Sequence, residues 1–237
     1  MGTIRAGAPL SRPHPRSSAP SAPWQWRIEQ RSLVILLPGV HQILSWAPLR
    51  GGLVRASSIV NHQIAPGDRL ATEHPRSYLQ RLVRRLGLDS GAVAMMTGVD
   101  MRKAAYAAAR RGDLMAGAWC TAGCSNALRI GDPATAGEIR FGTINLALAI
   151  NQPLSPCAMA EALAMATEAR VAAVLEAGVS STRTRRPATG TGTDCIAVAS
   201  PLRGPAHAYC GKHTVLGELI GKAAMRSCRI ALRRCTP

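Results

Sequence analysis

Short apolar runs of strand length alternate along this chain with longer segments of helical periodicity. Residues 32–37, 92–97, 116–121, 143–150 and 195–199 are the strand candidates. The helical candidates are residues 78–86, 103–111, 155–177 and a final helix that starts near Thr214. Alternating signals of this kind favour an α/β fold in which flanking helices cover a mostly buried sheet. We therefore expect one layered α/β domain.

The ends of several predicted elements carry specific signals. Ser155 is placed as an N-cap, Pro156 as the first helical residue, and Gly178 lies just beyond the last turn. Pro38 and Gly39 follow the first predicted strand and are expected to stop it. The predicted helix over residues 103–111 is expected to end at a glycine, and residues 78–86 place leucine and valine on one face.

The domain boundary follows from composition. Residues 1–23 are rich in proline, serine, alanine and arginine, and we expect them to form a disordered basic tail. Residues 24–237 then form a single domain. Aromatic residues make up only 3% of the chain, so its core must be built from alanine, leucine, isoleucine, valine and methionine.

The net charge of +16 raises the question of a nucleic-acid or membrane partner. The arginines that account for most of this charge are scattered along the chain, and no aromatic side chains are interleaved with them for base stacking. We therefore expect no nucleic-acid partner. Mean hydropathy is +0.05, and no apolar run approaches the ~20 residues that span a bilayer. Seven cysteines without a secreted-type framework indicate a reducing compartment, and we expect a cytoplasmic location without membrane attachment.

Four segments rich in glycine, threonine or asparagine adjoin predicted strands or helices: residues 121–126, 142–145, 188–194 and 211–214. Glycine lets backbone amides approach a ligand, and threonine and asparagine add neutral donors and acceptors. Each segment alone is also compatible with an ordinary turn, and residues 188–194 match neither a Walker loop nor a dinucleotide fingerprint. Together we expect a polar cup at one edge of the sheet. Its candidate substrate contacts are Asn126, Thr143, Asn145, Thr189, Gly190, Thr191, Gly192, Thr193, Thr214 and Glu218.

Carboxylates are scarce, which makes their positions informative. Asp194 ends the glycine–threonine loop, where it either caps the loop or orients a reacting water. Glu168 shares an apparently apolar helix face with Glu161, so it is either a base of raised pKa or half of a buried ion pair with an arginine. Glu218 lies one turn into the predicted final helix, where a favourable interaction with the helix dipole equally accounts for a carboxylate.

Metal ligation and thiol catalysis have weaker support in the sequence. His207, Cys210 and His213 have ligand-like spacing, but no second pair completes a tetrahedral set, so no metal site is expected. Cys124 has no base nearby in sequence that would make it a nucleophile.

Seven short segments of the chain, some of them described above, occur in the order and spacing of one known family. They are residues 51–52, 95–102, 142–145, 166–170, 188–194, 211–214 and 216–221. This ordered set, which spans residues 33–229, resembles the adenosylcobinamide amidohydrolase family. The resemblance implies hydrolysis of the amide between the corrin propionyl side chain and 1-amino-2-propanol, giving adenosylcobyric acid for cobalamin salvage. It also implies action on complete cobamides of the pseudocobalamin type in some members. The corrinoid is the substrate, and no cofactor is expected.

The roles we assign under this resemblance follow the needs of amide hydrolysis. Asp194 or Glu168 is expected to activate water, and His213 to donate a proton to the leaving amine. Backbone amides of residues 190–192, with Asn145 or Asn126, are expected to hold the oxyanion. The alternative is a corrinoid-binding protein without catalysis, which would tolerate loss of both carboxylates.

Overall fold

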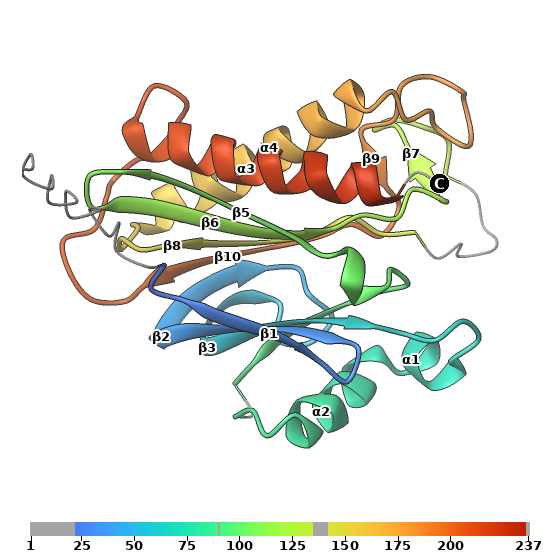
Figure 1. Cartoon of the computed structure of the whole chain (residues 1–237), viewed down its shortest axis with the longest axis horizontal. Coiled ribbons are helices and arrows are strands. Elements are labelled where there is room, and N and C mark those ends of the chain that lie inside the picture. Colours follow the sequence, from blue (N-terminus) through green and yellow to red (C-terminus); the bar gives the residue numbers. More distant parts are fainter. Residues whose placement is uncertain (1–21, 90, 135–141, 236–237) are drawn as a thin grey trace, which may run out of the picture.

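The computed structural model describes residues 22–89, 91–134 and 142–235, so almost all of the predicted tail lies outside the described residues. The fold is α/β with a large central sheet and flanking helices, as the alternation of signals predicts (Figure 1). Its strands are β1 Gln25–Glu29, β2 Ser32–Ser45, β3 Gly52–Gln63, β4 Val93–Thr97, β5 Ala105–Arg111, β6 Leu114–Thr121, β7 Ala127–Leu128, β8 Asn145–Ile150, β9 Gly190–Thr191 and β10 Cys195–Pro201. Its helices are α1 Arg69–Glu73, α2 Pro75–Arg85, α3 Pro156–Glu176 and α4 Val215–Cys235, with a 3₁₀ turn at Met101–Lys103.

The large sheet has eight strands in the order β4-β3-β2-β10-β8-β6-β5, with β1 also paired to β2. Strand β2 pairs with β1 through residues 32–36 and with β10 through residues 41–45. Between these two parts of β2 the register against β3 shifts: Leu36 lies opposite Ser58, whereas His41 lies opposite Ala56. The expectation that Pro38 and Gly39 stop this strand is therefore wrong: they form an irregularity within it, and such bulges bend a strand.

The part of the sheet formed by β10, β8, β6 and β5 stacks face to face on the part formed by β1, β2, β3 and β4, with helices on both outer sides (Figure 1). In β8, Leu146 and Leu148 join the cluster beneath α3 and α4. The alternate residues Ala147 and Ala149 instead contact the cluster that holds Ile35 of β2. This period of two buries both faces of the central strands, and small alanines let the two halves approach closely. On the far side, α2 packs on β2, β3 and β4 through its own cluster of buried leucine and valine.

The predicted helix over residues 103–111 is wrong. Residues 105–111 form β5, which pairs antiparallel with β6 around a turn at Gly112, whose φ is +57°. Alanine has the highest intrinsic helix propensity, but propensity amounts to less than about 1 kcal/mol per residue, and pairing with β6 and packing beneath α4 outweigh it.

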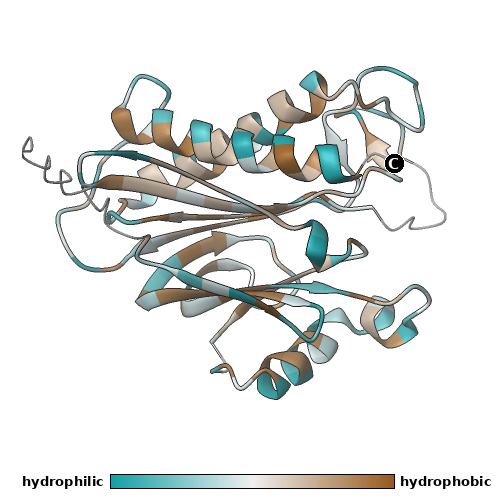
Figure 2. Cartoon of the chain, viewed as in Figure 1, coloured by the Kyte–Doolittle hydropathy of each residue, from teal (hydrophilic) through white to brown (hydrophobic). Residues whose placement is uncertain are grey.

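The other predicted helices are confirmed. The Ser155 hydroxyl accepts a hydrogen bond from the Ala158 amide at 3.1 Å, α3 begins at Pro156, and Gly178 has a φ of +67° just beyond its end. Hydrophobic and hydrophilic residues alternate along α4, as expected of a helix with one buried face (Figure 2).

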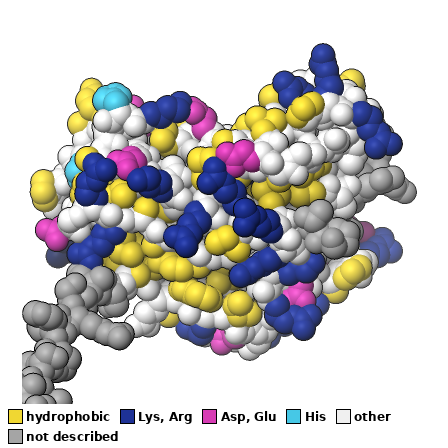
Figure 3. All heavy atoms as spheres, turned by 45° about the horizontal axis from the view of Figure 1, so that its top comes forward, with side chains coloured by type: hydrophobic (Ala, Val, Ile, Leu, Met, Phe, Trp, Pro, Cys, Tyr) yellow, Lys and Arg dark blue, Asp and Glu magenta, His cyan; other side chains and the backbone are white. Residues whose placement is uncertain are grey.

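Surface charge follows the scattered pattern of the sequence. Lysine and arginine side chains are spread over the face in Figure 3, between hydrophobic and neutral groups, and do not form one stripe. Within the described ranges, no helix has the length and apolar character needed to cross a membrane.

Candidate active site

Parallel pairing of β8 and β10 brings the predicted polar segments together. Asn145 at the start of β8 lies opposite Cys195 at the start of β10, and Thr121 at the end of β6 also faces Asn145. Three of the four predicted segments, residues 121–126, 142–145 and 188–194, therefore meet at one edge of the sheet. The Thr143 and Thr193 hydroxyl oxygens lie 2.8 Å apart across this junction.

Asp194 is the most heavily engaged carboxylate of this junction. It accepts from the amides of Ile144 and Thr191, each at 2.9 Å, and from the Thr191 hydroxyl at 2.5 Å. It also forms an ion pair with Arg170 of α3, with 2.8 Å between Oδ2 and Nη1. Both side chains are nearly buried, with exposed fractions of 6% for Asp194 and 11% for Arg170. Four donors on one carboxylate fix the conformation of the loop that precedes β10.

Gly190 shows how closely this loop wraps the carboxylate. A Cβ atom at this position would lie 2.3 Å from Asp194 Oδ2 and 3.3 Å from the Arg170 guanidinium. The glycine is therefore required by close approach, as its place in a glycine–threonine loop indicates.

A cavity of about 700 Å³ opens beside the loop. Thr191, Gly192 and Asp194 line one side of it, and Arg170 of α3 lines another. Two further arginines, Arg129 and Arg183, also line the cavity. Gly192 is exposed, and a Cβ there would lie 3.9 Å from Asn126 Nδ2, so the Asn126 amide stands beside the loop tip.

Asn145 lies behind this cavity, not in it. Its side chain is 1% exposed, and its amide nitrogen donates to Asn61 Oδ1 and to the Met96 carbonyl, both at 2.8 Å. Asn61 in turn donates to the Thr121 hydroxyl at 2.9 Å. This buried network ties β8 and β6 to β3 and β4. Among the described atoms, Asn145 Oδ1 is buried with no hydrogen-bond partner.

The fourth predicted segment lies at the other end of the sheet. Residues 211–214 follow the carboxyl end of β10, whereas Asp194 precedes its start, and seven strand residues separate the two by roughly 20 Å. His213 is exposed there, Thr214 accepts from the Gly217 amide at 3.0 Å as a helix cap, and Glu218 pairs with Arg111 and Lys222. The expectation that residues 211–214 complete the polar cup is wrong, because the length of β10 separates them from the other three segments.

Glu168 also departs from its prediction. Its side chain is 56% exposed and pairs with Lys212 at 2.5 Å, so it is neither buried nor paired with an arginine. The helix face that the sequence presents as apolar is open to solvent, since Ala164 and Leu175 are exposed as well. Short aliphatic side chains on a helix surface mislead a burial prediction made from sequence.

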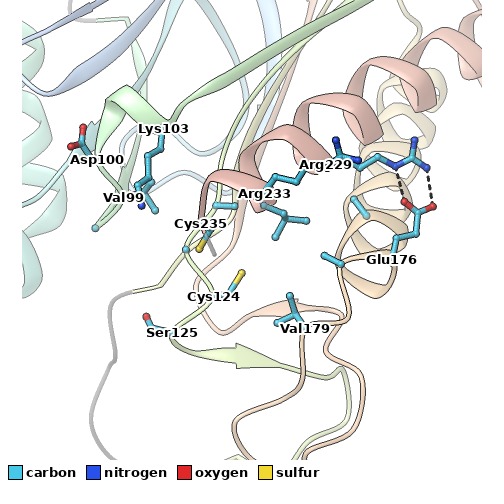
Figure 4. A pocket seen from close by; sticks show the side chains of 16 residues that line it. Val99, Asp100, Lys103, Cys124, Ser125, Glu176, Val179, Arg229, Arg233 and Cys235 are labelled. Atoms are coloured by element: carbon cyan, nitrogen blue, oxygen red, sulfur yellow. Dashed lines mark hydrogen bonds and ion pairs between the residues drawn. The ribbon is translucent and has the colours of Figure 1, made fainter. Parts of the chain in front are cut away.

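A second cavity of about 670 Å³ lies where the carboxyl ends of α3 and α4 meet residues 98–103 and 122–125. Glu176 of α3 forms a two-point ion pair with Arg229 of α4 along its wall, at 2.6 and 2.8 Å (Figure 4). Cys124 and Cys235 both line it, with Lys103 on the same wall. Sequence analysis missed Cys235 and Lys103, because nothing in the sequence places the end of the last helix beside residue 124.

The ligand-like spacing of His207, Cys210 and His213 does not correspond to a cluster. Cys210 is buried, and its thiol donates to the Ala158 carbonyl at 3.1 Å. Nowhere in the described part of the chain do three histidine, cysteine, aspartate or glutamate side chains gather as metal ligands.

Comparison with known proteins gives the family. Residues 21–237 match the family model described as adenosylcobinamide amidohydrolase. An uncharacterized protein of Methanocaldococcus jannaschii is 31% identical over 219 residues, which cover 84% of each chain. An adenosylcobinamide amidohydrolase of Methanosarcina mazei is 28% identical over 217 residues, 88% of this chain and 97% of that protein.

Two solved structures with low sequence identity also match part of the fold. A Burkholderia sp. beta-aminopeptidase has a TM-score of 0.45 at 14% identity, covering 84% of this chain and 78% of its own. The L-aminopeptidase D-Ala-esterase/amidase of Ochrobactrum anthropi has a TM-score of 0.40 at 14% identity, covering 90% and 82%. From the match of the family model over residues 21–237, this chain belongs to the adenosylcobinamide amidohydrolase family and is a hydrolase of amide bonds.

Proposed function

We propose that this chain hydrolyses the amide that joins the corrin propionyl side chain to 1-amino-2-propanol in adenosylcobinamide. The products are adenosylcobyric acid and the free amino alcohol, and the acid then serves cobalamin salvage. Complete cobamides of the pseudocobalamin type are substrates under the same proposal. The observation that carries it is the Asp194 carboxylate, held by Arg170 in the wall of a cavity and in contact with the Thr191 hydroxyl.

The contact between Thr191 and Asp194 provides a path for a proton. A water bound at the Thr191 hydroxyl passes a proton to Thr191 Oγ1, while the Thr191 proton moves to Asp194 Oδ1 across their 2.5 Å contact. The resulting hydroxide attacks the amide carbon. Asp194 then returns the proton through Thr191 to the leaving amine, so one carboxylate serves first as base and then as acid. This scheme replaces His213 and Glu168, which lie away from the cavity.

The loop tip supplies donors for the oxyanion. Gly192 and Thr193 are exposed, and their backbone amides and the neighbouring Asn126 side chain are the donors we assign to the tetrahedral intermediate. The ion pair with Arg170 keeps the loop in place before substrate arrives, so little reorganisation is needed at the moment of reaction.

The cavity suits one edge of a corrinoid. Drug-sized ligands occupy pockets of ~300–1,000 Å³, so a cavity of about 700 Å³ takes the aminopropanol arm and the nearest ring edge. Guanidinium groups of Arg129 and Arg183 can donate to amide carbonyls at the corrin periphery. The scheme uses only side chains of this chain, without a cofactor. We place the reaction in the cytoplasm because all seven cysteines are free thiols.

The test is incubation of the purified chain with adenosylcobinamide, followed by mass spectrometry for both products, with and without a chelator. Release of both products in the presence of chelator supports the scheme, and a corrinoid that binds but returns intact refutes it. Thr191→Ser and Thr191→Val separate the proton path from loop shape. The hydroxyl retained in Thr191→Ser should preserve turnover within about tenfold, whereas Thr191→Val should lose at least ~100-fold.

A further inference from the structure

Two cysteines from distant parts of the chain meet in the second cavity. Cys124 follows β6, Cys235 is the last residue of α4, and their sulfur atoms point toward one another (Figure 4). The two thiols lie close enough for each to shift the pKa of the other. Both side chains are half-buried and line the cavity, so small molecules in solvent can reach them.

The surroundings make the two thiols unequal. The hydrogen bond from Cys124 is the main cause that lowers the pKa of Cys235, and the positive charge of Lys103 lowers it further. The same contact and burial raise the pKa of Cys124. Lys103 lines the same cavity, and its positive charge favours the thiolate form of Cys235, which makes Cys235 the reactive cysteine and Cys124 the resolving one.

A second pair shows that contact alone does not create this arrangement. Cys120 and Cys228 also interact, but they are 1% and 0% exposed within the cluster beneath α3 and α4, and the Cys120 thiol donates to the Thr121 carbonyl at 3.7 Å. Burial and contact with Cys228 raise the pKa of Cys120. Neither cysteine lines the second cavity, so an oxidant dissolved in water has no access to this pair.

We propose that Cys124 and Cys235 form a reversible disulfide when the protein meets a hydroperoxide. The Cys235 thiolate attacks hydrogen peroxide, the O–O bond breaks, the departing hydroxide takes a proton from solvent and leaves as water, and Cys235 becomes a sulfenic acid. The Cys124 sulfur then attacks the Cys235 sulfur, the S–O bond breaks, and a second water leaves with the Cys124 proton. One peroxide thus oxidises two thiols to a disulfide, and a small thiol reverses the reaction by exchange.

The bond would join the end of α4 covalently to the segment that leads to Asn126. This inference does not depend on the proposed function, since it concerns thiol chemistry in the other cavity. Its failure therefore leaves the hydrolase proposal unaffected.

The first experiment treats the reduced full chain with equimolar hydrogen peroxide and maps the products by mass spectrometry of peptides under non-reducing conditions. We expect a peptide that links Cys124 to Cys235 and is lighter by two hydrogens, with two thiols lost from the seven and recovered with dithiothreitol. A link between Cys120 and Cys228, or overoxidised Cys235 without a link, would overturn the proposal.

Two substitutions test the hydrogen bond without forming a disulfide. Cys124→Ser keeps a donor to Cys235, and Cys124→Ala removes it. At pH 7, the rate of Cys235 alkylation by iodoacetamide should stay within about threefold of wild type in the serine variant. It should fall by about tenfold or more in the alanine variant, because the thiolate fraction at pH 7 drops by such a factor when the pKa of Cys235 rises from about 6 toward the ordinary thiol value. Equal rates in both variants contradict the assignment. Cys157→Ser, at an exposed lone cysteine, is the matched control and should still form the disulfide.

Discussion

His62 carries a buried imidazole whose protonation should govern stability in mild acid. It lies in β3 with 1% exposure, and its ring nitrogens contact the Ser32 hydroxyl at 2.8 Å and the Tyr78 hydroxyl at 3.1 Å. Burial, followed by the charges of Arg31 and Arg85, lowers the pKa of His62 from 6.5 to about 4. The serine beside it is fully buried, so this contact is structural and not a catalytic pair.

Whether stability rises or falls with pH depends on which state, folded or unfolded, binds the His62 proton first as the pH falls. In the unfolded chain His62 titrates near pH 6.5, whereas in the folded chain it stays neutral until the pH falls to about 4. The unfolded state therefore gains protons first as the pH falls. Stability is complete above about pH 6.5 and is lost toward pH 4. The two pKa values correspond to about 3 kcal/mol in total, of which about 2 kcal/mol is lost between pH 7 and pH 4.5.

Urea unfolding at several pH values between 7 and 4.5 measures this loss. Wild type should lose about 2 kcal/mol over that interval, and His62→Gln should remove most of the dependence. The residual slope comes from His41, whose pKa is also lowered by burial, and near pH 4.5 from Glu176 and Glu218, whose pKa values are lowered by hydrogen bonds to Arg229 and Lys222. His74→Gln makes the same change at an exposed histidine and should retain the wild-type dependence. Parallel pH profiles for wild type and His62→Gln would refute the reasoning.

Three further substitutions test the site and its frame. Asp194→Asn should lower kcat at least ~100-fold, because the proposed base is lost. It should also lower the free energy of unfolding in urea by about 3 kcal/mol, because Arg170 loses its ion-pair partner. Asp132→Asn, at the same cavity, is the control and should keep turnover. Near-normal turnover of Asp194→Asn removes it from the mechanism. Gly190→Ala should lower stability and turnover together, since its Cβ would lie 2.3 Å from Asp194 Oδ2, and an unchanged melting curve would show that the loop can yield. Ser155→Ala should cost about 1 kcal/mol in unfolding without change in kcat, and a loss of activity would contradict a role confined to capping α3 and to holding the Ala208 carbonyl.

The sequence predicts most elements of this fold correctly, because their signals are local. The Ser155 side chain satisfies one orphan amide of α3 within a single turn, so this signal can be read from neighbouring residues. The buried run that forms β8 is recognised from its apolar residues alone. Two errors came from tertiary context: β5 is a strand because β6 offers a pairing edge, and β2 continues past Pro38 because β3 accompanies both halves.

For the candidate site, the sequence by itself determined which segments are rich in groups that bind polar ligands, and it showed that Asp194 ends the glycine–threonine loop. Only the tertiary structure decided which of these segments meet. Parallel pairing of β8 and β10 gathers their starts at one edge, and it sends residues 211–214 to the opposite end. The packing of the two long helices leaves Glu168 of α3 exposed and brings Cys235, at the end of α4, into the same cavity as Cys124. Such contacts depend on strand direction and helix packing, which couple residues far apart in the chain and leave no local pattern at either one.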